Sequence, residues 1–467
     1  MIPVLTPEEM AGVDRAAPEP VEVLVERAGF AVARAARRLL GGAYGRRVVV
    51  VAGRGNNGAD GRVAARRLAA WGAAVNVIEA SSLGGGERLP AADLVIDAAY
   101  GTGLTRPYDP PDPGDAPVLA VDIPSGLSGL TGQGEAMAAR ATVTFAAYKP
   151  GLLLGEGPGR TGPVEVAAIG LEVLAGERAD MWLVTDDDLA LLPHRGRQAH
   201  KWQTAVMVVG GSEAMNGAPL MVAHGAMRAG AGYALVAVPG SPPGGGLPPG
   251  EQVGVSLPDG DWVPAAAEAA ARARALAVGP GLSRRARRDD GGTGPDTPVG
   301  RLLAATAVPA VVDADGITAL GAPDAVRAVV AGRDGPVILT PHEGEYQKLT
   351  GHRPEDDRIA DVRRTARQTG AVVLLKGSTT VVAAPDGRVL LAAAGGPSLA
   401  TAGTGDTLTG MIAAFLARGV APLEAAALAA HAHGRAASMG RREGLVASDL
   451  PDLVSDFLSE RVGGGHR

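Results

Sequence analysis

The sequence contains no cysteine and only four lysines, Lys149, Lys201, Lys348 and Lys376, among its 467 residues. The lack of cysteine excludes disulfides, thiolate metal sites and cysteine nucleophiles. Aromatic residues make up only 3%, and no apolar run reaches the roughly 18 residues that a membrane-spanning helix needs. Because arginine carries nearly all of the positive charge, each remaining lysine is a somewhat better candidate for a binding site than usual.

The charge balance is slightly acidic. Lys and Arg number 44 and Asp and Glu number 50, which gives a formal net charge of −6 and a pI near 5.8. Such a chain has no general attraction to nucleic acid or to anionic lipid, so we expect small-molecule partners and neither nucleic acid nor a membrane. The first residues, Met1 to Arg15, do not form a basic-then-apolar leader, and we therefore expect a cytoplasmic protein.

The length and the order of apolar runs predict two α/β domains. A capping-box pattern at Thr6-Pro7-Glu8-Glu9 predicts the first helix. Short apolar runs then alternate with helical stretches, which is typical of a parallel sheet covered on both faces. The first series of runs covers 48–51, 75–78, 94–96, 119–121 and 143–146, and the second covers 206–209, 235–238, 276–278, 310–312, 337–339 and 372–375. We place the first domain at residues 1–175, a linker leading into the second at 176–200, and the second domain at 201–462.

A first glycine-rich turn, Gly53-Arg54-Gly55-Asn56-Asn57-Gly58, follows a predicted strand and opens a predicted helix. The pattern G-x-G-x-x-G, with Glu79 near the place of a ribose-binding acid, is typical of a dinucleotide-binding dehydrogenase. Asn56, Asn57 and Asp60 favour a different ligand, because a carboxylate repels pyrophosphate while carboxamide oxygens suit a monovalent cation or a hydroxyl-rich molecule. A tight turn without a ligand is the plainer alternative.

Two further strand ends carry polar clusters. Asp97 precedes the glycine-rich segment Gly101 to Pro107, and Asp122 and Ser125 follow the next strand. Ligands of open α/β sheets bind beyond the carboxyl ends of the strands, so three such turns in succession predict one site.

These stretches, together with Lys149-Pro150-Gly151-Leu152, resemble the epimerase half of the bifunctional NAD(P)H-hydrate repair enzymes. The resemblance implies a Rossmann-like, doubly wound α/β/α sandwich in which Asp122 is catalytic and contacts the hydrated ring, and in which Asn57, Asp97 and Ser125 hold K⁺. It also implies that the substrate is bound by Asn56, Asn57, Gly58, Ala59, Asp60, Gly101, Thr102, Gly103, Leu104, Thr105, Arg106, Pro107 and Asp122. Ala59 departs from the family, which usually has glycine there.

A second glycine-rich turn, Gly403-Thr404-Gly405-Asp406, runs directly into an apolar helix. Backbone N–H groups of Ala402, Gly403, Thr404 and Gly405 at a helix N-terminus predict an anion hole for a transferring phosphoryl group. Asp406 beside it is the candidate general base, because a carboxylate there can accept the proton of an attacking hydroxyl. No Gly-x4-Gly-Lys-Ser/Thr motif occurs, which excludes a P-loop enzyme.

Residues from about 200 to 435 resemble the ribokinase-like superfamily and, within it, the ADP- or ATP-dependent NAD(P)H-hydrate dehydratases. The motifs are Asn216-Gly217-Ala218, Gly279 to Leu282, Val311 to Asp315, Thr340 to Glu345 and Lys376 to Thr380. The resemblance implies that Ala218, Gly281, His342 and Asp406 contact the hydrated substrate, and that Lys376, Gly377, Ser378, Thr379, Thr380 and Gly405 contact the adenine nucleotide. Mg²⁺ is expected on the donor phosphates, without an acid pair to assign to it. Trp202 departs from the family, which usually has glycine there.

The combined prediction is a fused repair enzyme for hydrated NADH and NADPH. The first domain would interconvert the two configurations of the hydrate, and the second would dehydrate one of them at the expense of ADP or ATP. We also expect a homo-oligomer. Two alternatives stay open: a kinase for a vitamin precursor fused to a nucleotide-binding domain, and a nucleotide sensor without catalysis.

Overall fold

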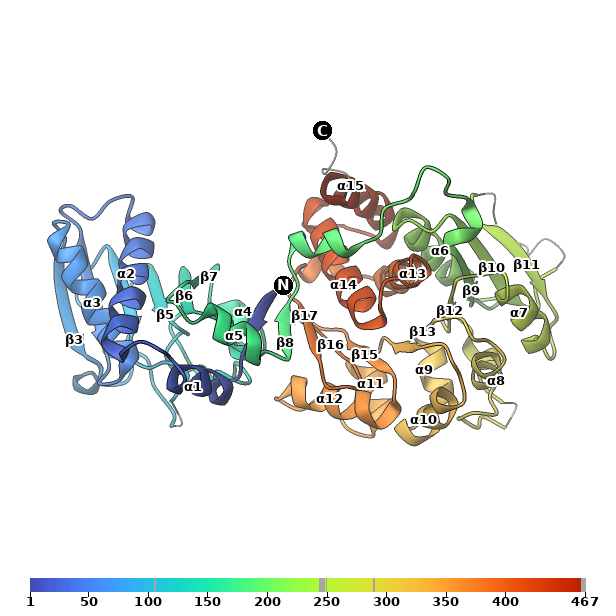
Figure 1. Cartoon of the computed structure of the whole chain (residues 1–467), viewed down its shortest axis with the longest axis horizontal. Coiled ribbons are helices and arrows are strands. Elements are labelled where there is room, and N and C mark those ends of the chain that lie inside the picture. Colours follow the sequence, from blue (N-terminus) through green and yellow to red (C-terminus); the bar gives the residue numbers. More distant parts are fainter. Residues whose placement is uncertain (105, 243–247, 249, 289, 463–467) are drawn as a thin grey trace. The chain divides into compact units, whose positions relative to one another are not determined.

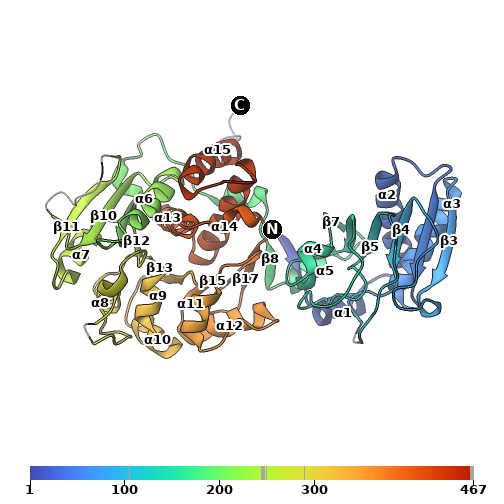
Figure 2. The same cartoon turned by 180° about the vertical axis from the view of Figure 1, so that it is seen from behind.

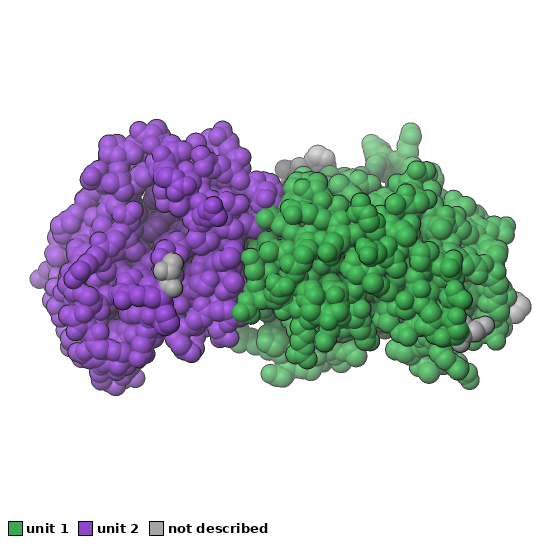
Figure 3. All heavy atoms as spheres, turned by 90° about the horizontal axis from the view of Figure 1, so that it is seen from below, with its two compact units in different colours: residues 1, 183–467 green, residues 2–182 purple. Residues whose placement is uncertain are grey.

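The computed structural model divides into two compact units (Figure 3). The N-terminal unit is Ile2–Trp182, and the C-terminal unit is Leu183–Arg467 together with Met1. The structure describes residues 1–104, 106–242, 248, 250–288 and 290–462. Within these residues, every helix is too short or too polar to cross a lipid bilayer.

The N-terminal unit is built on a parallel sheet whose strands lie in the order β3-β2-β4-β5-β6-β7 (Figure 1). The five strands predicted from apolar runs are confirmed, and β7 is an addition. The strands are β2 (Arg47–Ala52), β3 (Ala74–Glu79), β4 (Leu94–Ala98), β5 (Val118–Val121), β6 (Ala141–Phe145) and β7 (Val164–Ala167). Because all are parallel, their carboxyl ends meet at one edge of the sheet.

Two long helices cover one face of this sheet. α2 (Val21–Leu40) and α3 (Asn56–Ala70) pack on each other and on alternate strand residues such as Val48 and Val50. The intervening residues Val49 and Val51 face the opposite side, where they pack with Leu89 and Met137 of connecting segments. The predicted capping box forms at Thr6 and opens α1 (Pro7–Arg15). The unit also contains β1 (Ile2–Val4), η1 (Ala80–Ser82), η2 (Pro150–Leu152), α4 (Gly157–Arg160) and α5 (Glu172–Arg178), while β8 (Met181–Leu183) lies at the division between the units.

The sheet of the C-terminal unit has the order β17-β16-β15-β14-β13-β12-β9-β10-β11. It is parallel from β11 to β15, and β15, β16 and β17 pair antiparallel at the other side. The strands are β9 (Ala205–Val209), β10 (Tyr233–Pro239), β11 (Val253–Leu257), β12 (Ala275–Val278), β13 (Ala310–Val312), β14 (Val337–Leu339), β15 (Val372–Leu375), β16 (Thr380–Ala383) and β17 (Val389–Ala392). All six runs of the second predicted series form strands, whereas β11, β16 and β17 were not predicted.

Helices cover both faces of the C-terminal sheet, as Figures 1 and 2 show from opposite sides. One layer contains α6 (Gly217–Arg228), α13 (Thr404–Ala417), α14 (Pro422–Met439) and α15 (Leu450–Val462). The other contains α7 (Val263–Ala270), α8 (Pro298–Ala304), α9 (Asp315–Leu320), α10 (Pro323–Ala331), α11 (Glu343–Thr350) and α12 (Arg358–Thr369). Short 3₁₀ helices complete the unit: η3 (Asp186–Leu191), η4 (Lys201–Thr204), η5 (Ser283–Ala286), η6 (Pro397–Leu399) and η7 (Ala447–Asp449).

The close approach of α6 and α13 depends on glycine at position 410. A Cβ on Gly410 would lie 1.9 Å from the carbonyl oxygen of Val222 on α6, so Gly410→Ala must push the helices apart. We expect it to lower the free energy of unfolding by about 1–3 kcal/mol, seen as a lower urea midpoint. Gly217→Ala on α6 is the control, because its Cβ meets nothing within 4 Å. Equal midpoints for both variants would contradict this account of the packing.

Candidate active sites

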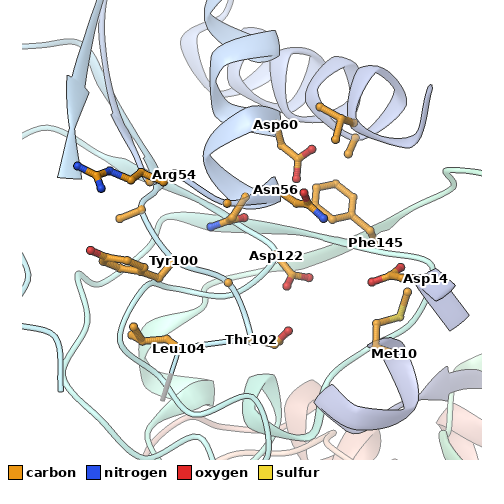
Figure 4. Close-up of a pocket in the computed structure, with 18 of the residues that line it drawn as sticks. Met10, Asp14, Arg54, Asn56, Asp60, Tyr100, Thr102, Leu104, Asp122 and Phe145 are labelled. Atoms are coloured by element: carbon orange, nitrogen blue, oxygen red, sulfur yellow. The ribbon is translucent and has the colours of Figure 1, made fainter. Parts of the chain in front are cut away.

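A cavity of about 840 Å³ opens at the carboxyl edge of the N-terminal sheet (Figure 4). Its lining comes from α1, from the turn between β2 and α3, from the segment after β4 and from the ends of β5 and β6. Figure 4 shows the side chains of Asp14, Asp60 and Asp122 directed toward the same space. The three predicted polar turns of this domain therefore do meet at one site.

The turn between β2 and α3 is held by close backbone contacts. A Cβ on Gly53 would lie 1.9 Å from the carbonyl oxygen of Ala99, and one on Gly58 would lie 1.9 Å from that of Gly53. Gly55 is the N-cap of α3, so Asn56 and Asn57 begin the helix. Gly53 thus lets the turn approach the residue that follows β4, and Gly58 lets the first turn of α3 pack on the end of β2.

Asp97 and Ser125, two of the three predicted K⁺ ligands, are in direct contact. The Ser125 hydroxyl donates to Asp97 Oδ1 at 2.6 Å, and the Ser125 N–H donates to Asp97 Oδ2 at 2.8 Å. Asp97 is fully buried, and burial raises its pKa above the usual value. The third, Asn57, lines the cavity, and both polar atoms of its carboxamide are buried without a hydrogen-bond partner among the described residues. An unpaired buried carboxamide is costly unless a ligand satisfies it, so these oxygens fit an unhydrated monovalent cation.

Asp122 is held by the buried Lys149. Lys149 Nζ donates to Asp122 Oδ1 at 2.6 Å, to Thr144 Oγ1 at 2.8 Å and to the carbonyl oxygen of Phe145 at 3.1 Å. The Thr144 hydroxyl also donates to Asp122 Oδ1, at 3.1 Å. Asp122 itself has φ +66°, in the left-handed region that costs a non-glycine residue about 1–3 kcal/mol. The Asp122 carboxyl group is therefore held directly after the carboxyl end of β5, where it is directed into the cavity (Figure 4).

Two more carboxyl groups face Asp122 from α3 and α1. Asp60 is only 6% exposed, and burial, aided by the negative charges of Asp122 and Asp14, raises its pKa to about 8. The pKa of Asp14 is also raised, mainly by burial. Neighbouring acids in a cavity with perturbed pKa values are typical of sites that transfer protons.

Most of the other predicted substrate-binding residues of this domain also line the cavity. They are Asn56, Gly101, Thr102, Gly103, Leu104 and Arg106. Thr105 lies outside the described residues. Gly58, Ala59 and Pro107 are described but do not line the cavity. The methyl group of Ala59, the departure from the family pattern, is therefore not part of its wall.

In the C-terminal unit the second glycine-rich turn opens α13 as predicted. Gly403 is the N-cap with φ +90°, and a Cβ there would lie 2.9 Å from the side chain of Ala447. The Thr404 hydroxyl is tied to the carbonyl oxygens of Leu399 and Thr401, which fixes the loop before the helix. The N–H of Thr404 donates to the carbonyl oxygen of Thr401 at 3.4 Å. The other N–H groups of the first helical turn have no carbonyl acceptor within the helix, so they are suited to an anion.

Asp406 lies among charged groups from β13, α11 and β15. Lys376 Nζ donates to Asp313 Oδ1 at 2.7 Å, and the Thr409 hydroxyl donates to Asp313 Oδ2 at 2.7 Å. A Cβ on Gly405 would lie 3.4 Å from Lys376 Nζ, so the lysine reaches the anion turn. Burial and the charges of Asp313 and Glu345, opposed by Lys376, raise the pKa of Asp406 to about 7. This carboxyl group is suited to accept a proton near neutral pH.

His342, Ala218 and Gly281 stand on loops and helix starts of the same unit. His342 caps α11 by accepting from the N–H groups of Gly344 and Glu345 through Nδ1. The N–H of His342 donates in turn to Glu345, whose pKa burial and Asp313 raise. A Cβ on Gly281, which has φ +72°, would lie 3.2 Å from that of Ala218, so these two predicted residues are neighbours.

Gly377 and Ser378 lie in the turn between β15 and β16, Thr379 is buried, and Thr380 begins β16. Trp202 packs edge-on against Tyr233, with ring centroids 4.6 Å apart.

Several groups of the two sites had no role assigned from the sequence: Asp14 and Thr144 in the first, and Asp313, Glu345 and Thr409 in the second. Asp313 and Glu345 were quoted only within the motifs Val311 to Asp315 and Thr340 to Glu345. Lys149 was quoted only as part of a motif. The scarcity of lysine was the one signal that could have singled it out, since two of the four lysines are salt-bridged to aspartates at these sites.

Comparisons with known proteins cover both units. The family model described as NAD(P)H-hydrate dehydratase matches residues 206–459, and the model described as YjeF-related protein N-terminus matches residues 21–85 and 81–151. The bifunctional NAD(P)H-hydrate repair enzyme of Salinibacter ruber is 36% identical and covers 100% of this chain and 98% of its own length. That of Moorella thermoacetica is also 36% identical, with 97% and 96% covered. A solved ADP/ATP-dependent NAD(P)H-hydrate dehydratase from Bacillus subtilis, co-crystallized with ATP/Mg²⁺, is 30% identical with a TM-score of 0.46, and covers 59% of this chain and 97% of that one.

The predicted α/β fold class with two domains is confirmed: this is an α/β enzyme whose two units are each built on a wholly or largely parallel sheet. The relatives match it along the whole chain. The chain belongs to the family of bifunctional NAD(P)H-hydrate repair enzymes.

The raised pKa of Asp60 makes stability depend on pH in a defined direction. The folded state holds this proton up to about pH 8, whereas the unfolded chain releases it near 3.8. The stabilisation is therefore complete below about pH 4 and is lost as the pH rises through about 8. At 1.36 kcal/mol per pKa unit the effect is on the order of a few kcal/mol. We expect the urea midpoint of the wild type to fall more between pH 5 and pH 9 than that of Asp60→Asn. Glu22→Gln, at an exposed position of α2, should follow the wild type; identical pH slopes for Asp60→Asn and the wild type would contradict the assignment.

Proposed function

We propose that this chain repairs hydrated NADH and NADPH, with an epimerase domain at residues 1–175 and a dehydratase domain at residues 201–462. The observation that carries the proposal is that each unit gathers its motif carboxylates at the carboxyl edge of its sheet, on a chain that matches bifunctional repair enzymes from end to end. Both partial activities then have a site of suitable chemistry.

In the first domain Asp122 acts on the hydrated carbon. Lys149 and Thr144 fix its carboxylate, which can take the proton of the ring hydroxyl. The bond between the hydrated carbon and the ring nitrogen then breaks, and that carbon becomes an aldehyde. When the nitrogen attacks the other face of the aldehyde, the ring closes with the opposite configuration. This reaction needs proton transfer and no redox cofactor. Asn56, Asp60 and the segment 101–107 would bind the nucleotide.

In the second domain Asp406 takes the proton of the substrate hydroxyl as that oxygen attacks the terminal phosphorus of ADP or ATP. Gly405, the turn 402–404, and residues 376–380 would hold the phosphates and the adenine nucleotide, and Ala218, Gly281 and His342 the substrate. The lone pair of the ring nitrogen then expels the phosphate, and loss of a proton from the adjacent carbon restores the double bond. Phosphorylation is useful here because hydroxide is a poor leaving group while phosphate is a good one.

Two metal ions belong to the proposal. K⁺ would be held by Asn57, Asp97 and Ser125, whose oxygens include the unpartnered carboxamide of Asn57. Mg²⁺ fits the second site because three carboxyl groups, those of Asp313, Glu345 and Asp406, lie there with Lys376. Burial first, and then the charge of Asp313, raises the pKa values of Glu345 and Asp406. When bound, Mg²⁺ neutralises charge on the donor phosphates. Assembly as a homo-oligomer stays a prediction.

A kinase that stops at a stable phosphate ester is the alternative, favoured by the likeness of the second site to a phosphoryl-transfer site. Product analysis separates the two functions. With ADP or ATP, the repair enzyme regenerates NADH absorbance in proportion to the donor consumed, whereas the kinase accumulates a phosphorylated alcohol.

We expect the two activities to be lost separately. Asp406→Asn should lower dehydration by about 10²–10⁴-fold and spare epimerisation, and Asp122→Asn should do the reverse, because each removes one general base. Dehydration is followed by NADH absorbance on the pure substrate configuration, and epimerisation by chromatography of the two forms. Asp187→Asn, at an exposed position outside both sites, is the matched control. Loss of both activities in either variant would contradict two independent sites.

The K⁺ assignment predicts a cation requirement of epimerisation alone. With choline in place of K⁺ the wild type should lose epimerase activity, and Asn57→Ala should raise the K⁺ concentration for half-activation by about tenfold or more, since a ligand oxygen is lost. Asn56→Ala is the matched control: it should alter the substrate KM without moving the half-activating K⁺ concentration. Full epimerase activity in choline would overturn the assignment.

A further inference from the structure

The cavity of the N-terminal unit contains carboxyl groups besides that of Asp122, and the proposed proton transfer by Asp122 does not use them. Asp14, Asp60 and Asp122 approach it from α1, α3 and the end of β5 (Figure 4). The lysine of the cavity, Lys149, is bound to Asp122, Thr144 and the carbonyl oxygen of Phe145. Its three donors are thereby used, so it cannot also pair with Asp60.

Asp60 and Asp122 have opposite surroundings. Asp122 has an ammonium group and a hydroxyl group at hydrogen-bond distance. Asp60 is 6% exposed, and its carboxyl group has no hydrogen-bond or ion-pair partner among the described residues, while the charges that act on it are those of Asp122 and Asp14. A buried carboxyl group between other carboxylates retains a proton, because a second uncompensated charge in the cavity is costly.

Several other charged groups around α3 are paired elsewhere. Glu79 pairs with Arg62, Glu26 with Arg66 and Arg67, and Glu19 with Arg27. Arg54 and Arg106 also line the cavity, and Arg106 lies on Tyr100. None of these cations contacts Asp60, and Asp14 is more exposed to solvent than Asp60, although partial burial also raises the pKa of Asp14.

We propose that Asp60 is the second proton-transfer residue of the epimerisation, acting as the acid where Asp122 acts as the base. The inference rests on the proposed function of this domain. Two carboxyl groups with opposite surroundings, provided by different elements and facing one cavity, suit a reversible ring opening.

The step balances without any further reactant. Asp122 takes the hydroxyl proton, the carbon–oxygen bond becomes a carbonyl, and the carbon–nitrogen bond breaks with its electron pair on nitrogen. Asp60 delivers its proton to that nitrogen. After rotation of the aldehyde, nitrogen attacks the other face of the carbonyl, the proton on nitrogen returns to Asp60, and Asp122 returns its proton to oxygen.

The pH profile of epimerisation tests this role. In the wild type, kcat should fall at alkaline pH as Asp60 loses its proton. Asp60→Asn should lower kcat by about 10²–10⁴-fold and abolish the alkaline fall, and Asp60→Glu should restore part of the rate together with that fall. Asp14→Asn is the matched control, since it removes a carboxylate of the same cavity and should keep the alkaline fall.

Two readouts keep the result decisive. Infrared difference spectra at neutral pH should show a protonated carboxyl band in the wild type and in Asp14→Asn that Asp60→Asn lacks, without any substrate present. Dehydratase activity of the same chain reports that each variant is folded. An Asp60→Asn variant with unchanged kcat and an unchanged alkaline fall would overturn the acid role, as would an absent carboxyl band. A wild type without epimerase activity would instead overturn the proposed function.

Discussion

A largely buried lysine–aspartate pair lies at the carboxyl edge of the sheet in each unit, with Lys149 buried in the first and Asp313 buried in the second. Lys149 joins Asp122 at 2.6 Å in the first unit, and Lys376 joins Asp313 at 2.7 Å in the second. Buried ion pairs are costly unless their remaining hydrogen-bonding groups are satisfied. Here Lys149 has two further oxygen acceptors, and the second oxygen of Asp313 accepts from Thr409. Each pair therefore fixes a carboxylate in a defined position.

A second carboxyl group lies near each pair and is incompletely compensated: Lys376 lowers the pKa of Asp406, but burial and the nearby carboxyl groups outweigh it. With the lysine engaged, Asp60 in one unit and Asp406 in the other lie near a negative charge and partly out of water, and their pKa values rise to about 8 and about 7. A fixed anion beside a carboxyl group that titrates near neutral pH is useful for proton transfer. The two units thus share an electrostatic arrangement: a lysine–aspartate pair lies near a carboxyl group whose pKa is raised.

The sequence predicts those features of the fold and the sites that are determined by short stretches of the chain. The strands from β2 to β6, the capping box at Thr6 and the two turns at Gly53 and Gly403 follow from local patterns. Asp14 could not be assigned, because its place in the cavity depends on how α1 packs, and nothing near it in the chain marks it. The hairpin of β16 and β17 was missed because no helix separates its strands. Glycine is required at position 58 because a Cβ there would collide with the carbonyl oxygen of Gly53. The motif alone does not distinguish this steric requirement from a contact with a ligand.

The two proposed reactions place opposite demands on a site, which explains the use of two units. Ring opening moves a proton between neutral and negatively charged groups, and a cavity with three carboxyl groups suits it. In that cavity Lys149 is bound to Asp122, Thr144 and the carbonyl oxygen of Phe145, so this lysine is not free to neutralise a transferring phosphoryl group. Phosphoryl transfer needs helix N–H groups and a cation, which the start of α13 and Lys376 provide. The lysine–aspartate pair is therefore used differently in the two units: Lys149 is fully engaged in holding Asp122, whereas Lys376 binds Asp313 and also lies beside the anion turn.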